Sequence, residues 1–258
     1  MFPQTLFSIA GYNVNLYLLF YTLGGIPAII LGLRLARERA IPLMIVMDVC
    51  VIGGISALGA ALLFYALTQS FLPTLPNVWG IPAIAGFLIA AIIYGARHPL
   101  RQANVLVPLD VAFAPLALYQ AITRLGCFCA GCCHGKPVCV ECQFPWAVTF
   151  ADPSSASIYQ GVPVYPTQLL LALGDLLIAL TLLALKDKPE FRGALIWVYL
   201  IGYGVLRFSV EFTRGDVRAM VGDLYLSQVI GLALALIGAL MLTRRFALGM
   251  RAQVEVSS

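Results

Sequence analysis

Seven stretches of the chain consist almost entirely of apolar residues, and short polar segments separate them. Each stretch is about long enough to cross roughly 30 Å of hydrocarbon at a rise of about 1.5 Å per residue. The pattern predicts an all-α polytopic membrane protein with seven transmembrane helices, the third being the shortest. The predicted helices cover residues 14–34, 43–68, 80–96, 105–125, 166–185, 194–213 and 224–243.

The loops between these helices leave no room for a separate soluble domain. We therefore expect a single membrane domain over residues 1–247 and a cytoplasmic tail over 248–258, which is short, mostly polar and expected to be disordered. The segment before the first helix carries no Lys or Arg, and no small-residue cleavage site follows it. It does not resemble a secretory signal peptide, so we expect the first helix to stay in the membrane.

Composition supports a membrane class and excludes several others. Of 258 residues, 61% are apolar and only 11% are charged, against about 25% charged in a soluble domain. These values exclude an ordinary cytosolic enzyme, a disordered chain and a fibrous repeat. The net charge of +4 is too small to indicate a nucleic-acid partner.

Basic residues are distributed very unevenly between the two sets of loops, which predicts the orientation. Eleven lie on one side and three on the other, so we expect a multi-pass membrane protein with the N-terminus outside and the C-terminus inside. The cytoplasmic set is Arg34, Arg37, Arg39, Arg97, Arg101, Lys186, Lys188, Arg192, Arg244, Arg245 and Arg251, and the outer set is Lys136, Arg214 and Arg218.

The sixth predicted helix carries a polar ridge. Arg207 and Glu211 are four residues apart and so share one helix face. Tyr203 precedes them by another turn, and Arg214 continues the ridge toward the outer face. Ionisable groups cost about 2.5–3.5 kcal/mol each inside a bilayer. An internal salt bridge would explain the pair, but desolvation offsets its attraction, so we favour a functional site.

Three aspartates inside predicted helices leave more than one explanation open. Asp48, Asp110 and Asp175 lie in the second, fourth and fifth helices. A carboxylate in such a position can cap a neighbouring helix, pair with a buried arginine or take part in catalysis, and the sequence does not separate these roles.

The long outer loop, predicted over residues 126–165, contains six of the seven cysteines. The segment that ends the fourth helix and enters this loop runs from Arg124 to Lys136 and reads Arg-Leu-Gly-Cys-Phe-Cys-Ala-Gly-Cys-Cys-His-Gly-Lys. A glycine-rich turn flanked by cations at the membrane surface suits a phosphate headgroup. The glycines, which permit close backbone approach, are Gly126, Gly131 and Gly135.

The cysteines admit three interpretations. They could bind zinc, but their crowded spacing matches no standard zinc pattern, so we expect no metal. They could form disulfides in an oxidising exterior, with Cys139–Cys142 among them. They could be small free thiols that pack in the interior. His134 in the same turn is either a structural polar residue or an acid–base group facing the outer side.

Several of these segments are similar to the signature stretches of the bacterial prolipoprotein diacylglyceryl transferases. The family signature Arg-Ile/Leu-Gly-Asn-Phe-x-Asn-Gly-Glu-x-x-Gly is matched at the arginine, the phenylalanine and all three glycines. The remaining matches are Pro145–Phe150, Pro166–Leu169 with Gln168, the segment Tyr203 to Arg214, Asp216, Gln228 and Tyr17.

This resemblance implies seven helices, an outward N-terminus and an active site toward the outer face. It implies transfer of the diacylglyceryl group of phosphatidylglycerol to the lipobox cysteine of preprolipoprotein signal peptides, forming a thioether and releasing glycerol phosphate, without a cofactor. By the resemblance, Arg124 and Arg207 hold the phosphate, and Glu211 orients Arg207 or acts as the base. The remaining site residues would be Tyr203, Tyr17, Gln168, Arg214, His134 and the glycine turn.

The chain departs from the family at several polar positions. Cys127, Ala130 and Cys132 stand where the signature has Asn, Asn and Glu, and Tyr165 replaces a histidine. The family's His-Gly-Gly near the start of the third helix and its arginine in the second helix are also missing. With the family histidine absent, the base is unidentified. Three alternative functions stay open. They are a paralogous phospholipid-modifying enzyme with another acceptor, a membrane thiol-relay or metal-binding protein, and a structural partner of the lipoprotein machinery.

Overall fold

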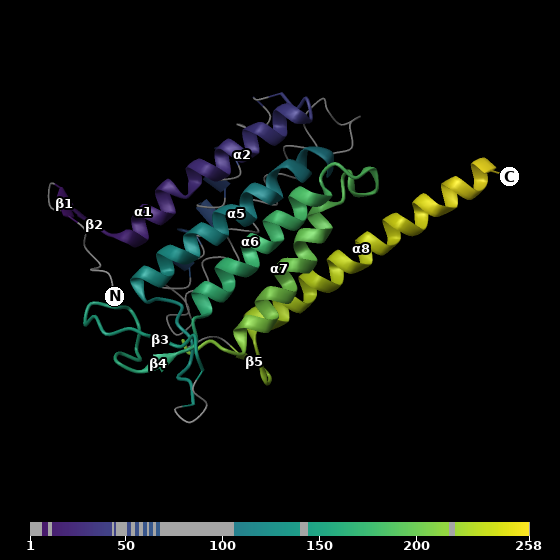
Figure 1. Ribbon diagram of the computed structural model, residues 1–258. Helices are drawn as coiled ribbons and strands as arrows, with labels where there is room; N and C mark the ends of the chain where they lie inside the picture. Colours follow the sequence, from purple (N-terminus) through teal and green to yellow (C-terminus); the bar gives the residue numbers. More distant parts are fainter. Residues whose placement is uncertain are drawn as a thin grey trace.

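The fold was analysed in a computed structural model of the chain (Figure 1). The structure describes residues 7–9, 12–42, 44, 106–139, 144–216 and 220–257, together with pairs of helical residues between 51 and 67. The predicted third helix and most of the predicted second helix lie outside the described residues, as does Asp48.

The described part of the chain is mostly helical, which confirms the predicted class of polytopic helical membrane protein. Short antiparallel strand pairs join some of the helices: β1 (Phe7–Ile9) with β2 (Tyr12–Val14), β3 (Val148–Thr149) with β4 (Pro163–Val164), and β5 (Met220–Val221) with β6 (Leu224–Tyr225). The helices are α1 (Leu16–Leu23), α2 (Gly25–Glu38), α5 (Leu106–Ala130), α6 (Thr167–Leu185), the 3-10 turn η2 (Pro189–Phe191), α7 (Leu195–Glu211) and α8 (Leu226–Ser257).

Four described segments are long and apolar enough to cross a bilayer: Leu16–Glu38, Asp110–Ala130, Thr167–Leu185 and Leu226–Leu248. They correspond to the first, fourth, fifth and seventh predicted helices. The sixth corresponds to α7, which has 17 residues, the lower end of the length that spans a membrane. The count of seven helices and their orientation stay predictions.

The helices pack in a chain of neighbours. Both α1 and α2 lie on α5, α5 packs along α6, α6 contacts α7, and α7 packs closely on α8 (Figure 1). The strands β3 and β4 lie at the end of the bundle where α5 ends and α6 begins. This arrangement places the Cys-rich turn next to the N-terminus of α6 and the C-terminus of α7.

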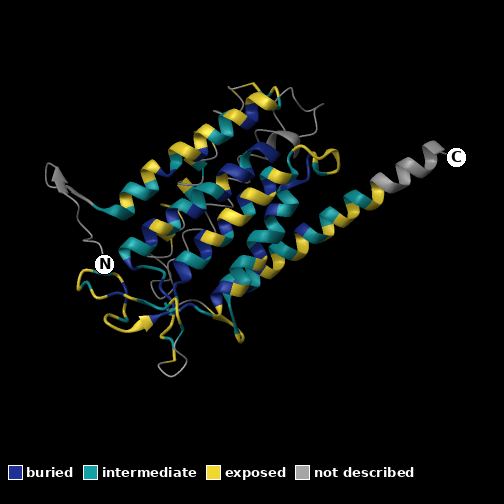
Figure 2. Ribbon diagram, in the orientation of Figure 1, coloured by how far each residue is buried: buried dark blue, intermediate teal, exposed yellow. Residues whose placement is uncertain are grey.

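Burial is inverted relative to a soluble protein. Large apolar side chains are exposed on the outside of the helices, and polar side chains are buried between them (Figure 2). An exposed apolar surface of this extent indicates a membrane environment. The exposed group includes Leu18, Ile29, Leu173, Leu177, Leu236 and Leu240, and the fully buried group includes Gln168, Asp175 and Glu211.

Two boundaries differ from the predictions. Helix α5 continues to Ala130 rather than ending at 125, so Cys127 and Cys129 lie on its last turn and not in a loop. Its end is set by Gly131 at φ 74°, the usual left-handed stop of a helix. Helix α8 continues to Ser257 where a disordered tail was expected. Ala, Met, Arg, Gln and Glu in this segment are strong helix formers, and no proline interrupts them.

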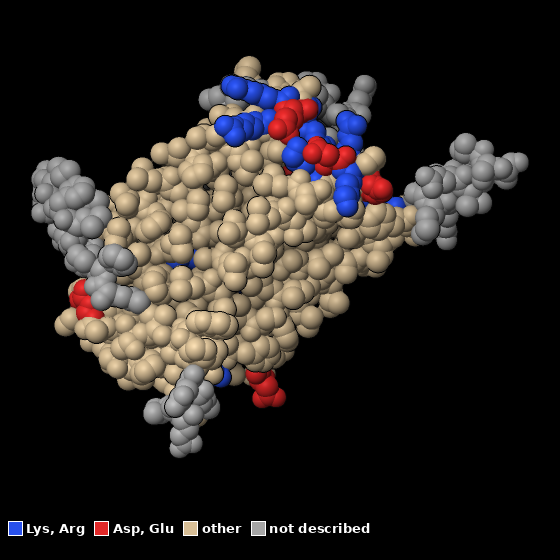
Figure 3. All heavy atoms as spheres, in the orientation of Figure 1, with Lys and Arg blue, Asp and Glu red and all other residues tan. Residues whose placement is uncertain are grey.

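Charged side chains gather at one end of the molecule, opposite the Cys-rich turn (Figure 3). Lys186 forms a salt bridge with Glu38 at 2.7 Å, which joins α6 to α2. Guanidinium groups of Arg39 and Arg245 donate to the carbonyls of Lys186 and Arg192. The described residues of the predicted cytoplasmic set lie at this end, which fits the uneven distribution of basic residues predicted from the sequence.

Asp110 is explained by this same end of the bundle. Its buried carboxylate accepts hydrogen bonds from the backbone N–H groups of Gly193 and Leu195, the latter at 2.9 Å. These are donors at the start of α7 that no intrahelical carbonyl satisfies. Of the roles left open by the sequence, capping of a neighbouring helix is therefore the one that Asp110 fills.

We expect Asp110→Asn to destabilise the protein by about 1–2 kcal/mol, because hydrogen bonds to a buried charged acceptor are lost or weakened. The matched control is Asp187→Asn, which removes the same charge from an exposed side chain and should change stability by less than about 0.5 kcal/mol. Thermal unfolding of both variants in detergent measures the difference. Equal melting temperatures for the two variants would contradict the capping role.

Candidate active site

An ion pair lies on the face of α7 that is turned into the bundle. Arg207 Nη2 is 3.0 Å from Glu211 Oε2, and the two side chains are 12% and 0% exposed. The spacing of four residues on one helix allows this contact. The predicted pairing of the two residues is thus confirmed, and it occurs in the interior rather than at the surface.

A second buried carboxylate brings two more helices to the same place. Asp175 of α6 is fully buried, and both Arg124 of α5 and Arg207 of α7 act on it electrostatically. Tyr203, one turn before Arg207, is an electrostatic neighbour of both arginines. The two guanidinium groups therefore balance two carboxylates in a shared interior cluster. We call Arg124, Asp175, Tyr203, Arg207 and Glu211 the charged cluster.

Arg124 retains an unused donor. Its Nε is buried and has no hydrogen-bond partner in the described part of the chain. A buried N–H without an acceptor costs free energy of about 1–3 kcal/mol, and a guanidinium offers a planar fork that fits phosphate oxygens. An anionic oxygen supplied by a ligand would satisfy this group.

The Cys-rich turn is fixed through its backbone. Thr167 Oγ1 donates to the carbonyl of Cys133 at 2.7 Å, and Gln168 Nε2 donates to the carbonyl of Cys132 at 2.9 Å. Both donors belong to the first turn of α6. Gln168, which was predicted to bind substrate, therefore holds the backbone of the turn in place.

Two glycines make this turn possible. Gly131 has φ 74°, and a Cβ at this position would lie 2.0 Å from Ser155 Oγ. A Cβ on Gly135 would lie 2.3 Å from the carbonyl oxygen of Tyr165. Gly126 lies where α5 crosses α1, with Tyr17 and Phe20 against it. The predicted close backbone approach is present at all three glycines.

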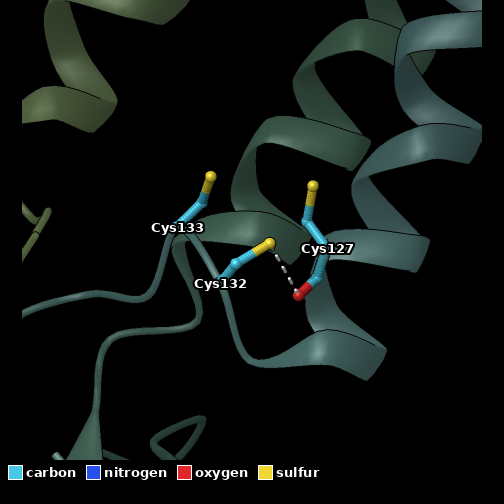
Figure 4. A group of neighbouring side chains, drawn as sticks. All are labelled: Cys127, Cys132 and Cys133. Carbon is cyan, nitrogen blue, oxygen red and sulfur yellow. Dashed lines mark hydrogen bonds between the residues drawn. The ribbon is translucent and has the colours of Figure 1, made fainter. Parts of the chain in front are cut away.

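Three thiols lie close together in this region, with the Cys132 sulfur directed toward Cys127 (Figure 4). The sulfurs of Cys127, Cys132 and Cys133 all lie within 4.8 Å of one another. Hydrogen bonds from the Cys127 and Cys132 thiols, together with the Arg214 charge, lower the pKa of Cys133. Hydrogen bonding with the Cys127 and Cys133 thiols, together with burial, raises the pKa of Cys132, and its thiol donates to the carbonyl of Cys127 at 3.7 Å.

The three interpretations of the cysteines receive different outcomes. Cys139 is disulfide-bonded, which confirms the disulfide interpretation for this residue, whereas Cys142 lies outside the described residues. Cys127, Cys129, Cys132 and Cys133 are free thiols. The disulfide interpretation therefore does not apply to these four, and the packing and metal interpretations both stay open for them.

His134 is buried, and both of its ring nitrogens face the backbone. Nδ1 lies 3.1 Å from the carbonyl oxygen of Gly135, and Nε2 accepts from the N–H of Ile158 at 3.4 Å. Both ring nitrogens are therefore occupied by the backbone of the turn and of the neighbouring loop. His134 thus contributes to the packing of the turn, in line with the structural alternative.

Tyr17 of α1 faces the same turn from the other side. Its ring packs on Tyr21 at 4.4 Å between centroids, and the Tyr21 hydroxyl lies 3.8 Å from the sulfur of Cys127. A pocket of about 310 Å³ opens between Asn15, Tyr17 and Cys132.

Arg214 lies on the opposite side of the turn, beyond α7. It is buried and donates from Nε and Nη2 to the two carboxylate oxygens of Asp216, both at 2.9 Å. Its neighbour Gly215 donates to the carbonyl of His134 at 3.1 Å. The ridge predicted along α7 therefore ends at the cysteine turn rather than in open solvent.

The structure brings the predicted arginines, Glu211, Tyr203 and the cysteine turn to one end of the bundle, and it leaves Lys136 exposed. Sequence reasoning left Asp175 unassigned. Its position seven residues after Gln168, on the same face of α6, was a usable signal. The convergence of three thiols was also missed, because it depends on the extra turn of α5.

Comparisons with known proteins point to one family. The chain matches the sequence model of the family described as prolipoprotein diacylglyceryl transferase over residues 4–244. It is 32% identical to the phosphatidylglycerol–prolipoprotein diacylglyceryl transferase of Clostridium tetani over 244 residues, covering 90% of this chain and 94% of that one. A protein of the same name from Finegoldia magna is 31% identical, with 91% and 92% covered.

The glycine turn provides a test of the site's architecture. Gly131 and Gly161 share φ 74°, but a Cβ on Gly161 meets nothing within 4 Å. We expect Gly161→Ala to cost about 1–2 kcal/mol for the left-handed backbone alone. Gly131→Ala should cost about 1–3 kcal/mol more, because the added methyl overlaps Ser155. Thermal unfolding measures both, and equal losses would refute the close approach.

Proposed function

Because this chain belongs to the prolipoprotein diacylglyceryl transferase family, we propose that it joins the diacylglyceryl group of phosphatidylglycerol to the lipobox cysteine of preprolipoprotein signal peptides. The chain is a diacylglyceryl transferase, and the relatives' names give its substrates as phosphatidylglycerol and prolipoprotein. A paralogous lipid enzyme and a thiol-relay protein are not favoured by these relatives.

The protein is a bacterial membrane protein, and we place it in the inner membrane. Seven helices with an outward N-terminus and a cytoplasmic C-terminus fit the basic residues gathered at one end of the described bundle. The charged cluster and the cysteine turn then face the outer side. Phosphatidylglycerol would enter from the bilayer with its headgroup at that face.

The buried Nε of Arg124, which has no hydrogen-bond partner in the described part of the chain, is the observation that supports this site most directly. A phosphodiester oxygen would accept from it. Arg207 lies in the same cluster and is held by Glu211 at 3.0 Å. Two guanidinium groups around one phosphate would bind the headgroup and stabilise the charge of the leaving group.

The reaction is a displacement at a glycerol carbon. The sulfur of the acceptor cysteine attacks that carbon, a C–S bond forms, and the C–O bond to phosphate breaks. The electron pair of that bond leaves with glycerol phosphate, and the thiol proton is lost to a base. Tyr203 and Tyr17 would hydrogen-bond the headgroup, while Gly126, Gly131, Gly135 and Gln168 shape the pocket.

Glu211 and His134 are the candidates for the proton acceptor. Glu211 is a candidate because it is a carboxylate in the cluster, but its pairing with Arg207 favours a positioning role. His134 has both nitrogens directed at backbone groups. Arg214 is paired with Asp216 and would act on the turn more than on the lipid.

We expect Arg207→Ala to lower the rate of transfer at least about 100-fold, as loss of one charge-stabilising donor does in other enzymes. Glu211→Gln should lower it for the same reason, because Arg207 loses its anchor. The assay mixes purified protein, phosphatidylglycerol and a lipobox peptide, and detects the peptide adduct and released glycerol phosphate by mass spectrometry.

The matched control is Arg37→Ala, an exposed arginine at the opposite end of the bundle, which should keep near-normal transfer. Full transfer by Arg207→Ala would show the phosphate assignment to be wrong. Release of glycerol phosphate without a peptide adduct would instead favour a lipid enzyme with another acceptor.

A further inference from the structure

The free thiols at the end of α5 have a geometry that the phosphate site does not use. The sulfurs of Cys127, Cys132 and Cys133 lie within 4.8 Å of one another. Zinc–sulfur bonds of about 2.3 Å separate the sulfurs of a tetrahedral site by roughly 3.8 Å. In Figure 4 the side chains of Cys127 and Cys133 point in the same direction and the Cys132 sulfur is directed toward Cys127, so side-chain rotations would be needed to close the three sulfurs around one ion.

The backbone around these sulfurs is held in place. Thr167 and Gln168 fix the carbonyls of Cys133 and Cys132, and supporting hydrogen bonds of this kind orient metal ligands. Cys133 has φ 59°, a conformation that a residue with a Cβ rarely adopts. Such a conformation persists where the surrounding structure enforces it, often at functional sites.

The surroundings suit an anionic metal site. Three thiolates around Zn²⁺ carry one net negative charge, and a buried charge needs a nearby counter-charge. Arg214 lies against the Cys133 thiol, and Arg124 is an electrostatic neighbour of Cys127 and Cys133. Soft thiolates select zinc over the hard cations that prefer oxygen ligands.

The described residues supply three ligands and leave room for a fourth. No further His, Cys, Asp or Glu among them joins this group, and neighbouring His134 uses both nitrogens on the backbone. Structural zinc sites take four protein ligands, whereas catalytic ones take three and keep an open position. Cys132 also lines the pocket with Asn15 and Tyr17, which gives access to the ion.

We propose that Cys127, Cys132 and Cys133 bind Zn²⁺, and that its open position takes the acceptor thiol of the prolipoprotein. The second half of this inference rests on the proposed function. The acceptor binds as a thiolate and its proton passes to solvent, because a coordinating thiol is deprotonated outright. The sulfur then forms the C–S bond while the lipid C–O bond breaks, and the neutral thioether leaves the metal. This site would supply the thiolate for which the described residues offer no evident base.

Metal binding is tested first on the full-length protein in detergent under reducing conditions. We expect an equimolar zinc content by mass spectrometry after loading with ZnCl₂ and removal of excess. Cys132→Ser and Cys133→Ser should each lose most of it. Cys129→Ser is the matched control, since this free thiol of the same helix end lies outside the group of three, and it should keep its zinc.

Wild-type protein without bound zinc, or an equal loss of zinc in Cys129→Ser, overturns the proposal. Cobalt-loaded protein provides a second readout that does not depend on folding of a variant. Its sulfur-to-metal charge-transfer absorption should increase on addition of a lipobox peptide, as a fourth sulfur joins the ion. A peptide with the cysteine changed to alanine should leave it unchanged. No increase with the cysteine peptide overturns the role of the open position.

The effect on transfer has a characteristic pH dependence. At pH 7 removal of zinc should slow transfer about 30-fold, the gain from complete ionisation of a thiol with a pKa of about 8.5. At pH 9 the free thiol is largely ionised, so the loss should shrink to less than about two-fold, and added zinc should restore the rate. A zinc-free protein that transfers at the full rate at pH 7 refutes the activation step.

These outcomes separate the two proposals. Zinc binding and peptide coordination without any transfer would support the metal site and reject the proposed function. Transfer by a protein that never binds zinc would support the proposed function and reject the metal site.

Discussion

Charge placed inside an apolar bundle is the constraint on which the rest of the described structure depends. Arg124, Asp175, Arg207 and Glu211 come from three helices and meet where water is largely excluded. Each charge alone would be expensive in a bilayer, so the helices must bring opposite charges together. The neighbour order of α5, α6 and α7 follows from this requirement at one end, and from apolar packing of Leu35, Phe113, Leu182 and Leu195 at the other.

Such a cluster is a poor way to gain stability, because desolvation of buried ions cancels much of their attraction. Its retention is better explained by what it does for a ligand. Arg207 is held by Glu211 at 3.0 Å and is therefore pre-oriented for a phosphate. Arg124 interacts electrostatically with Asp175. The Nε–H of Arg124 has no hydrogen-bond acceptor among the described residues. A ligand would supply that acceptor and complete the arrangement.

The sequence alone could predict features that depend on local spacing. The helical class, α6 and α7 to within about two residues, and the Arg207–Glu211 pair all follow from periodicity. Contacts between helices could not be derived this way. Asp175 reaches Arg124 and Arg207 only through the packing of α5, α6 and α7, and Asp110 reaches the start of α7 across 83 positions of sequence.

The cysteine turn shows the same limit more sharply. A helix ending at 125 would leave Cys127 in a loop, whereas α5 ending at Ala130 turns it back toward Cys132 and Cys133. The positive φ angles of Gly131 and Cys133 complete that reversal. Only glycine gives a sequence signal for such a conformation, so the convergence of the thiols was not visible beforehand.

Backbone anchoring explains how this turn can keep its shape while its side chains change chemistry. Thr167 and Gln168 bind carbonyls, not side chains, of Cys133 and Cys132. The matched glycines of the signature therefore preserve the scaffold, and cysteine can replace the polar side chains without loss of the fold. Arg124 belongs to the charged cluster and also interacts electrostatically with the thiols of Cys127 and Cys133. A phosphate bound on one side and a thiolate on the other would thus share one cation, which favours the approach of two anionic reactants that would otherwise repel each other.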